Sequence, residues 1–234
     1  RNGIPLARSI NAHTAYAIPA EIENREYTAK ALVDILDLDE DFIFQRITKH
    51  SAVEWLKKKI TDEQAHQLLA LDLPGIGVVP TSTRIYPYGS VAPQVLGFVG
   101  IDNQGLEGLE LYYDDFLRGK PGQTIFERDA HGRALEDGLR GYLPGQKGGD
   151  LVLTLDIFIQ RMAEEEVRRA TLETGSRLGL ILISDPKTGE ILATAVYPSF
   201  DIEDHGNAPV ANRKNIAVTD TYEPGSTFKG VTAA

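Results

Sequence analysis

A glycine-rich segment is the feature that most restricts how this chain can fold. Between Gly138 and Gly149 the sequence holds five glycines and one proline, a composition typical of turns and linkers. The pattern of apolar and polar residues changes across this segment. A chain of 234 residues is long enough for two modest domains. We therefore predict two units, residues 1–148 and residues 149–234.

The first unit is expected to be rich in strands and to carry a helical insert. Residues 1–20 alternate loosely between apolar and polar, which predicts an extended strand. Between about residues 28 and 75, apolar residues recur at helical spacing and predict the insert. Asp41 is predicted to cap its second helix, and Thr61 with Gln64 has the spacing of a capping box on its third.

The remainder of the first unit alternates between predicted strands and one helix. Residues 76–86 are β-branched and apolar, which favours a strand, and residues 106–117 read as a helix that ends at Gly119. Residues 123–128 and 133–135 are predicted to flank a hairpin turn at residues 129–132.

The second unit opens with a strand, a helix and a hairpin. Residues 151–155 are expected to form the strand, and Asp156 to cap a helix that runs to about Leu172. Two further strands, 180–184 and 191–196, are joined by a tight turn. This order predicts the start of an α/β domain with an antiparallel sheet, and the whole chain is expected to be α+β.

Composition excludes several classes of function. The net charge of −10 argues against a nucleic-acid binder, because phosphate contacts need a basic face. The absence of cysteine excludes disulfides, thiol catalysis and Cys-containing zinc sites. No stretch approaches the roughly 18–20 apolar residues that span a bilayer, and no signal peptide is visible at Arg1.

A serine and a lysine near the end of the chain are the candidate catalytic pair. Ser226 and Lys229 follow Pro224, which favours a helix start, and their spacing places both on one helix face. A serine hydroxyl is a weak nucleophile until a neighbouring base takes its proton, and a buried lysine can act as that base. We predict that Ser226 is the nucleophile and Lys229 the general base.

The Ser-x-x-Lys pattern alone is weak, and this sequence contains it twice. The second copy, residues 184–187, falls where a strand runs into a turn, and its Pro186 would disrupt a helix. Residues 9–11 match Ser-x-Asn and residues 187–189 match Lys-Thr-Gly, the other two signatures of serine acyl-transferases. Both precede Ser226, against the order of these signatures, so we interpret them as structural.

Longer stretches support the pair by resemblance to a known family. Residues 222–229, Tyr-Glu-Pro-Gly-Ser-Thr-Phe-Lys, are similar to the nucleophile motif of class B (monofunctional) penicillin-binding proteins. Residues 149–160 and 183–197 resemble the start of their transpeptidase domain. Further matches to the juxtamembrane motif and to the pedestal (or dimerisation) domain lie at residues 1–7, 84–87 and 105–114.

The resemblance implies an activity and a location. Family members cross-link peptidoglycan stem peptides that end in D-Ala-D-Ala, and β-lactams acylate the same serine. It implies a β-lactamase-like catalytic domain on an elongated pedestal, without a metal or organic cofactor. It also implies one upstream transmembrane helix, a place on the extracytoplasmic face of the membrane, and a membrane glycosyltransferase as partner. Because the later motifs would lie beyond Ala234, we expect these 234 residues to be inactive alone.

Two other functions stay open. The pedestal could act as a non-catalytic module that binds partner proteins, or the chain could belong to a β-lactam sensor or a class D-like β-lactamase. The roughly 148 residues before the catalytic start argue against a bare β-lactamase.

Several other polar and aromatic residues have structural interpretations. Arg84, Glu107 and Glu110 are expected to hold the fold rather than to face a partner. Tyr112 and Tyr113 are expected at the core and rim of the pedestal. The acidic and basic residues of 164–169 are expected on a solvated helix face, and the histidines lack metal-ligand spacing.

Overall fold

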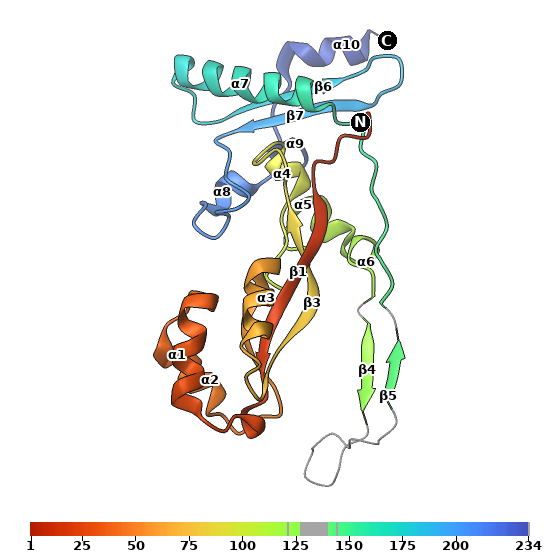
Figure 1. The fold of residues 1–234 in the computed structure, drawn as a ribbon. Helices are drawn as coiled ribbons and strands as arrows, with labels where there is room; N and C mark the ends of the chain where they lie inside the picture. The colour runs from red at the N-terminus through yellow and green to blue at the C-terminus, as the bar shows by residue number, and fades with distance from the viewer. Residues whose placement is uncertain (121, 127–139, 144, 234) are drawn as a thin grey trace.

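A three-stranded antiparallel sheet runs along the first half of the molecule (Figure 1). The computed structural model describes residues 1–120, 122–126, 140–143 and 145–233. The central strand β1 (Arg8–Ala17) pairs with β2 (Glu54–Ile60) on one side and with β3 (Ile76–Ile85) on the other. The strands predicted within residues 1–20 and 76–86 are therefore confirmed.

Strand β2 corrects the predicted helical insert. It lies inside residues 28–75 but pairs with β1, so this region is part of the sheet domain and not a purely helical addition. Its three consecutive lysines are poor strand formers and hid the alternation of its apolar residues. Leu56 and Ile60 point into the core, whereas Trp55 is 47% exposed.

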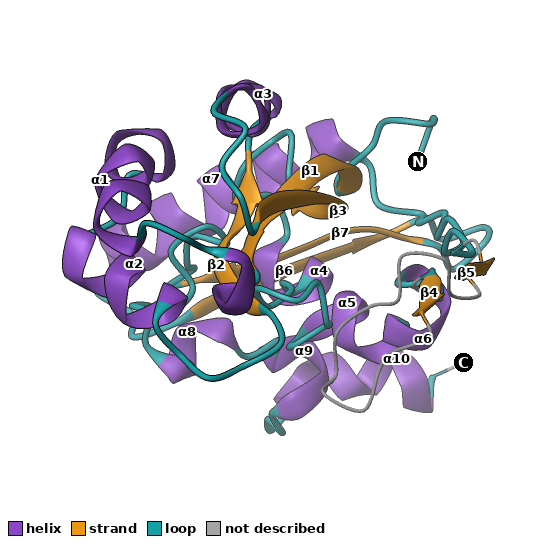
Figure 2. Ribbon diagram, turned by 60° about the horizontal axis from the view of Figure 1, so that its bottom comes forward, coloured by secondary structure: helices purple, strands orange, loops and turns teal. Residues whose placement is uncertain are grey.

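Three helices pack against this sheet. They are α1 (Arg25–Leu36), α2 (Glu40–Ile47) and α3 (Asp62–Ala70), and Figure 2 shows α1 and α2 side by side next to it. A short 3₁₀ turn, η1 (Pro19–Glu21), leads into them. The capping box of α3 is confirmed.

The cap predicted for α2 was wrong by two residues. Asp39 has extended backbone angles and accepts from the backbone N–H groups of Asp41 and Phe42, whereas Asp41 is already helical.

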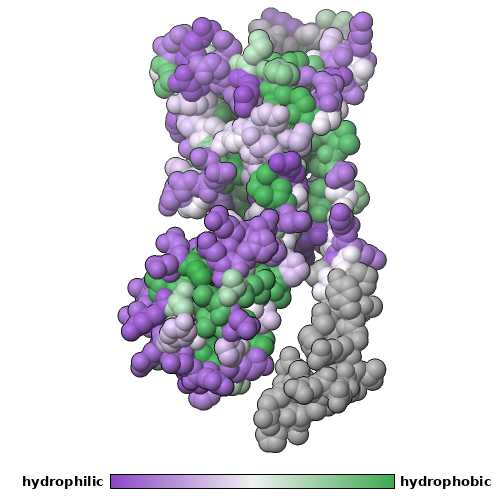
Figure 3. All heavy atoms as spheres, viewed as in Figure 1, coloured by the Kyte–Doolittle hydropathy of each residue, from purple (hydrophilic) through white to green (hydrophobic). Residues whose placement is uncertain are grey.

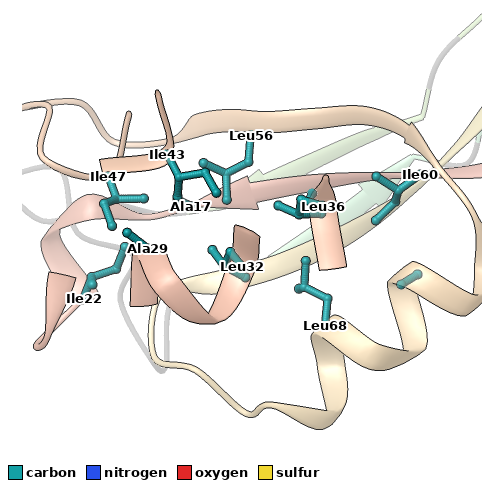
Figure 4. Close-up of a cluster of buried hydrophobic side chains, with 12 residues drawn as sticks. Ala17, Ile22, Ala29, Leu32, Leu36, Ile43, Ile47, Leu56, Ile60 and Leu68 are labelled. Atoms are coloured by element: carbon teal, nitrogen blue, oxygen red, sulfur yellow. The ribbon is translucent and has the colours of Figure 1, made fainter. Parts of the chain in front are cut away.

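The main core fills the space between these helices and the sheet. Leu32, Leu36, Ile43 and Ile47 are fully buried, and Figure 4 shows them pointing toward side chains from the sheet such as Leu56. Apolar residues three and four positions apart lie on one face of a helix, which explains why α1 and α2 each bury a single stripe. Elsewhere on the molecule, hydrophobic residues reach the surface in patches between hydrophilic ones (Figure 3).

Short helices follow β3. They are α4 (Pro93–Leu96), α5 (Gly108–Tyr112) and α6 (Asp114–Leu117). The single helix predicted over residues 106–117 is thus two helices, interrupted at Tyr113, whose φ of −108° and ψ of 21° leave the helical region. Tyr112 is 80% exposed, so its expected place in the core was wrong.

A two-stranded ribbon lies beside the sheet domain. Strand β4 (Gln123–Phe126) pairs with β5 (Arg140–Leu143). The partner strand predicted at residues 133–135 and the turn at 129–132 lie outside the described residues. Strand β5 lies within the glycine-rich segment, which is therefore not a linker throughout its length.

The second half of the chain places one long helix on a hairpin. Helix α7 (Ile157–Thr174) is capped by Asp156, and β6 (Gly179–Ser184) pairs with β7 (Ile191–Tyr197), as predicted. The helix packs on both strands. Residues 151–155 do not form the predicted strand. The Thr154 hydroxyl and the Asp156 N–H instead donate to the backbone at the start of β7, at Ile191 and Leu192, without a continuous ladder.

The two halves share a hydrophobic cluster. Tyr86, Leu96 and Phe98 from the first half pack with Phe200 and Ile202 from the second. Rings of Phe98 and Phe200 meet edge to face, with centroids 6.0 Å apart. Apolar residues of the first half therefore pack directly against those of the second.

Candidate functional site

The predicted nucleophile and base lie in one short helical segment. A 3₁₀ helix, η2 (Gly225–Phe228), runs directly into α10 (Lys229–Thr232). Gly225 enters it with a φ of +56°, a value that glycine adopts without strain. In a 3₁₀ turn residues three apart are eclipsed, so Ser226 and Lys229 are arranged on the same side of the segment. Ser226 was expected in the first turn of a helix, and that turn is 3₁₀ rather than α.

The pair faces solvent. Both residues are exposed, and among the described residues no hydrogen bond joins their side chains. The segment before them contains α8 (Val210–Arg213) and α9 (Ile216–Thr219), with Asn215 capping α9. The described residues thus set the spacing of the pair but do not enclose it.

The competing motif matches lie on strands and a turn. Ser184 ends β6, and Asp185 opens a tight turn in which its carboxylate accepts from the backbone N–H of Lys187 at 2.8 Å. Gly189 closes the turn with a φ of +76°. Residues 9–11 lie within β1. None of these matches has the helical setting that the predicted pair has.

Helix α7 is fixed to the hairpin by a buried amide. The Gln160 side chain is 1% exposed, donates to Thr194 O at 2.8 Å and accepts from Thr194 N at 2.7 Å. These two hydrogen bonds satisfy the N–H and C=O of Thr194 in the middle of β7, and they fix the position of α7 against the sheet.

Glu164 corrects the expectation of a solvated helix face. Its Oε1 accepts from the Ala92 backbone N–H at 2.7 Å and from Gln160 Nε2 at 2.8 Å, so it ties α7 to the entrance of α4. Burial raises the pKa of the Glu164 carboxyl, although these two hydrogen bonds act in the opposite direction. The neighbouring Glu165 and Glu166 do form exposed pairs with arginines three residues on.

Replacing Glu164 with glutamine will stabilise the chain near neutral pH, and the gain will shrink as pH falls. The pKa of Glu164 in the folded chain lies above the ordinary 4.5. The contribution of this carboxyl to the free energy of unfolding is therefore fully present only below pH 4.5, and it is lost as pH rises through the folded pKa. Glutamine keeps an oxygen acceptor and removes the charge. Urea denaturation at about pH 4 and about pH 7.5 will measure the difference, with Glu173→Gln as an exposed control. A difference that does not change with pH would contradict this.

The described residues hold no cluster suited to a metal. No group of three or more histidine, cysteine, aspartate or glutamate side chains comes together in this part of the chain. His205 instead stacks on Phe98, with ring centroids 4.0 Å apart, and His13 contacts Asp62. In the same residues no helix is long and apolar enough to cross a membrane.

Sequence reasoning missed a group of residues that joins the two halves. Ser90, Gln94 and Arg213 each contact the opposite half of the chain. No spacing or motif marks them, because their partners lie far away in the sequence. Arg84 and Glu110, in contrast, form the expected fold-holding ion pair, at 2.8 Å.

Family comparisons cover most of the chain. Residues 1–153 match the penicillin-binding protein dimerisation domain, and residues 179–234 match the penicillin-binding protein transpeptidase domain. The stage V sporulation protein D of Bacillus subtilis is 40% identical over 238 residues, which are 100% of this chain and 37% of that protein. The peptidoglycan D,D-transpeptidase FtsI of Escherichia coli is 32% identical over 236 residues, 98% of this chain and 40% of its own length.

Solved structures show the same fold. A peptidoglycan synthetase from Bifidobacterium adolescentis superposes with a TM-score of 0.66 at 23% identity, covering 97% of this chain and 46% of that one. The penicillin-binding protein PBP2 of Helicobacter pylori, solved in complex with MreC, has a TM-score of 0.62 at 22% identity over 87% of this chain and 41% of that one.

The chain spans about two fifths of the length of the sequence relatives that it matches. The dimerisation-domain match alone covers well over half of this chain, and the transpeptidase match includes both Ser226 and Lys229. The chain belongs to the class B penicillin-binding proteins and contains their dimerisation domain and part of their transpeptidase domain.

Proposed function

We propose that the parent protein is a serine D,D-transpeptidase in which Ser226 is the nucleophile and Lys229 the general base. The observation that supports this most directly is the shared helical segment, which follows Pro224 and arranges the two side chains on one side. Relatives named as peptidoglycan D,D-transpeptidases support the reaction class.

The proposed reaction has two acyl-transfer steps. Lys229 takes the proton of the Ser226 hydroxyl as its oxygen attacks the carbonyl carbon of the penultimate D-Ala of a stem peptide. The peptide bond to the terminal D-Ala breaks, and the leaving amine takes up a proton. The amine of a second stem peptide then attacks the acyl-enzyme, releases Ser226 and forms the cross-link. A β-lactam acylates the same oxygen through opening of its ring.

The chain alone is proposed to be inactive. A groove that binds substrate and a complete set of oxyanion donors are needed for acyl transfer, and loss of one such donor typically costs about 10²–10³ in rate. The chain spans only about two fifths of the length of its sequence relatives, which supports this.

The first unit, residues 1–148, is proposed to act as a pedestal that also binds partners. The relative from Helicobacter pylori was solved in complex with MreC, which supports a partner-binding role in this family. We propose a membrane glycosyltransferase as the partner of the parent protein, an upstream transmembrane anchor, and a location on the extracytoplasmic face. The boundary between the two units is proposed at residues 148 and 149.

Covalent labelling of the full-length parent protein tests the activity. A fluorescent penicillin should label it close to one-to-one, and peptide mapping should place the adduct on Ser226. The adduct should persist for hours, since a transpeptidase deacylates slowly, whereas rapid turnover would indicate a β-lactamase instead. An adduct on another serine would contradict the assignment of Ser226. A pull-down with residues 1–148 alone tests whether that unit binds the glycosyltransferase.

A further inference from the structure

The chain reaches Ser226 through a connecting segment that is held by the other half of the molecule. This segment, residues 199–213, begins after β7 and ends with α8. The side-chain amide of Gln94 donates a hydrogen bond to Oγ of Ser199, the first residue of the segment, at 3.3 Å. It also donates to the backbone oxygen of Asn212, near the end of the segment, at 2.9 Å. Asn212 Nδ2 in turn donates to Ser199 O at 3.3 Å. One pedestal residue therefore bonds to both ends of the connecting segment.

Gln94 is itself rigidly placed. It is 6% exposed and lies on α4, where Pro93 occupies the first turn. The preceding Ala92 has a φ of +49°, which is rare for alanine, and its N–H donates to Glu164 on α7 at 2.7 Å. Such a conformation persists only where the surroundings hold it. Helix α7 thus sets the position of α4, and α4 sets the position of the Gln94 amide.

Other contacts tie the same segment to the pedestal. Ser90 Oγ donates to Asp201 Oδ1 at 2.9 Å and accepts from Ile202 N at 3.1 Å. Arg213 Nε lies 3.4 Å from Glu107 Oε1. Ser90 therefore holds the early part of the segment and Glu107 its end, whereas Gln94 alone among these residues bonds to both.

The position of the connecting segment affects where the chain places Ser226, the proposed nucleophile. Beyond Arg213, Asn215 caps α9, which contacts β6, and the chain then continues to Ser226. The direction in which the chain approaches the catalytic pair is therefore determined between the pedestal contact at Arg213 and the sheet contact of α9.

We propose that Gln94 is a positioning residue for acyl transfer. By bonding to Ser199 and Asn212 it closes the connecting segment and fixes the path along which the chain enters the Ser226 motif. The proposal rests on the function proposed above, because it concerns the placement of the Ser226 nucleophile. It also means that the pedestal supplies part of the support of the catalytic serine and is more than a spacer.

Gln94→Met in the full-length parent protein tests the proposal. Methionine has nearly the same length and flexibility but donates no hydrogen bonds. A misplacement of about 1 Å at a reacting atom can cost about 10²-fold in rate. We expect the limiting rate constant for acylation by a fluorescent penicillin to fall roughly 10- to 100-fold, while its non-covalent dissociation constant and the fraction of active protein stay within about twofold of wild type. Gln67→Met, an exposed glutamine on α3, is the matched control.

A second measurement uses the 234-residue chain and does not depend on activity. Hydrogen exchange of Gln94→Met should be faster than wild type in residues 199–213 and unchanged in α7. Ser199→Ala removes only one of the two bonds and should give a smaller change in the same peptides.

Each outcome bears on the proposal. Unchanged acylation and unchanged exchange in Gln94→Met, with normal labelling of the wild type and of Gln67→Met, would overturn the role of Gln94 and leave the proposed function standing. A lower active fraction with a normal rate constant would assign Gln94 a purely structural role and would also overturn it. Absence of labelling in the wild type would refute the transpeptidase assignment, and this proposal with it.

Discussion

Replacing Lys229 with methionine in the full-length parent protein will lower the rate constant for acylation of Ser226 by roughly 10²–10⁴-fold, the usual contribution of a positioned general base. Methionine is close to lysine in length and cannot take the proton of the serine hydroxyl. Both residues lie in one short helical segment, so removal of the base should not displace the nucleophile. Stopped-flow measurement with a fluorescent penicillin gives the rate constant, and Ser226→Ala, which should form no adduct, gives the baseline.

The second Ser-x-x-Lys of this chain provides a matched control. Lys187 lies in the exposed turn after β6, three residues beyond Ser184, and has the same sequence spacing without the helical setting. In Lys187→Met, Ser226 should be acylated by the fluorescent penicillin with the wild-type rate constant. Equal losses in both variants would indicate a general effect of removing a lysine, and a normal rate in Lys229→Met would show that another group is the base.

The parts of this molecule that the sequence predicted are those determined by local interactions. The prediction of helix α7 was correct because local residues mark both ends of the helix. Asp156 caps its start, and Gly175 ends it with a left-handed backbone conformation. The prediction of the β6–β7 hairpin was correct because a tight turn brings two strands that are neighbours in the sequence side by side. The spacing of Ser226 and Lys229 is likewise contained in one helical turn, so it could be read without knowledge of the fold.

The parts that were missed depend on distant partners. Strand β2 reads as lysine-rich and exposed, and only pairing with β1 makes it a strand. Gln94 carries no sequence signal, because its two acceptors lie 105 and 118 residues further along the chain. Glu164 was assigned to solvent because its neighbours are charged, whereas its partner Ala92 belongs to the other half. Contacts between the two halves could therefore not be predicted from local patterns, although they hold the connecting segment, residues 199–213, in place.

One buried ion pair links the sheet of the pedestal to its short helices. Arg84, on β3, donates through Nε to Glu110 Oε1 on α5 at 2.8 Å, and its Nη1 donates to Ser9 Oγ on β1 at 3.2 Å. The Arg84 side chain is 17% exposed and that of Glu110 only 6%. Helix α5 lies close to the Gln94-bearing α4, so displacement of α5 would also affect the contacts that reach the connecting segment.

Arg84→Met is expected to lower the free energy of unfolding by about 3–5 kcal/mol, because it leaves the Glu110 carboxylate buried without its cation. Urea denaturation of the 234-residue chain, followed by circular dichroism, measures the change. Arg168→Met is the control, since its pair with Glu165 is exposed and should contribute little.

The double variant Arg84→Met/Glu110→Leu separates the two explanations of such a loss. If the cost arises from the stranded carboxylate, replacing Glu110 as well should recover most of the lost stability, since apolar residues often replace a buried ion pair without loss. If the cost arises from the packing of the arginine side chain, the double variant should be no more stable than Arg84→Met. A loss in Arg84→Met no larger than in Arg168→Met would show that the pair does not hold α5 to the sheet.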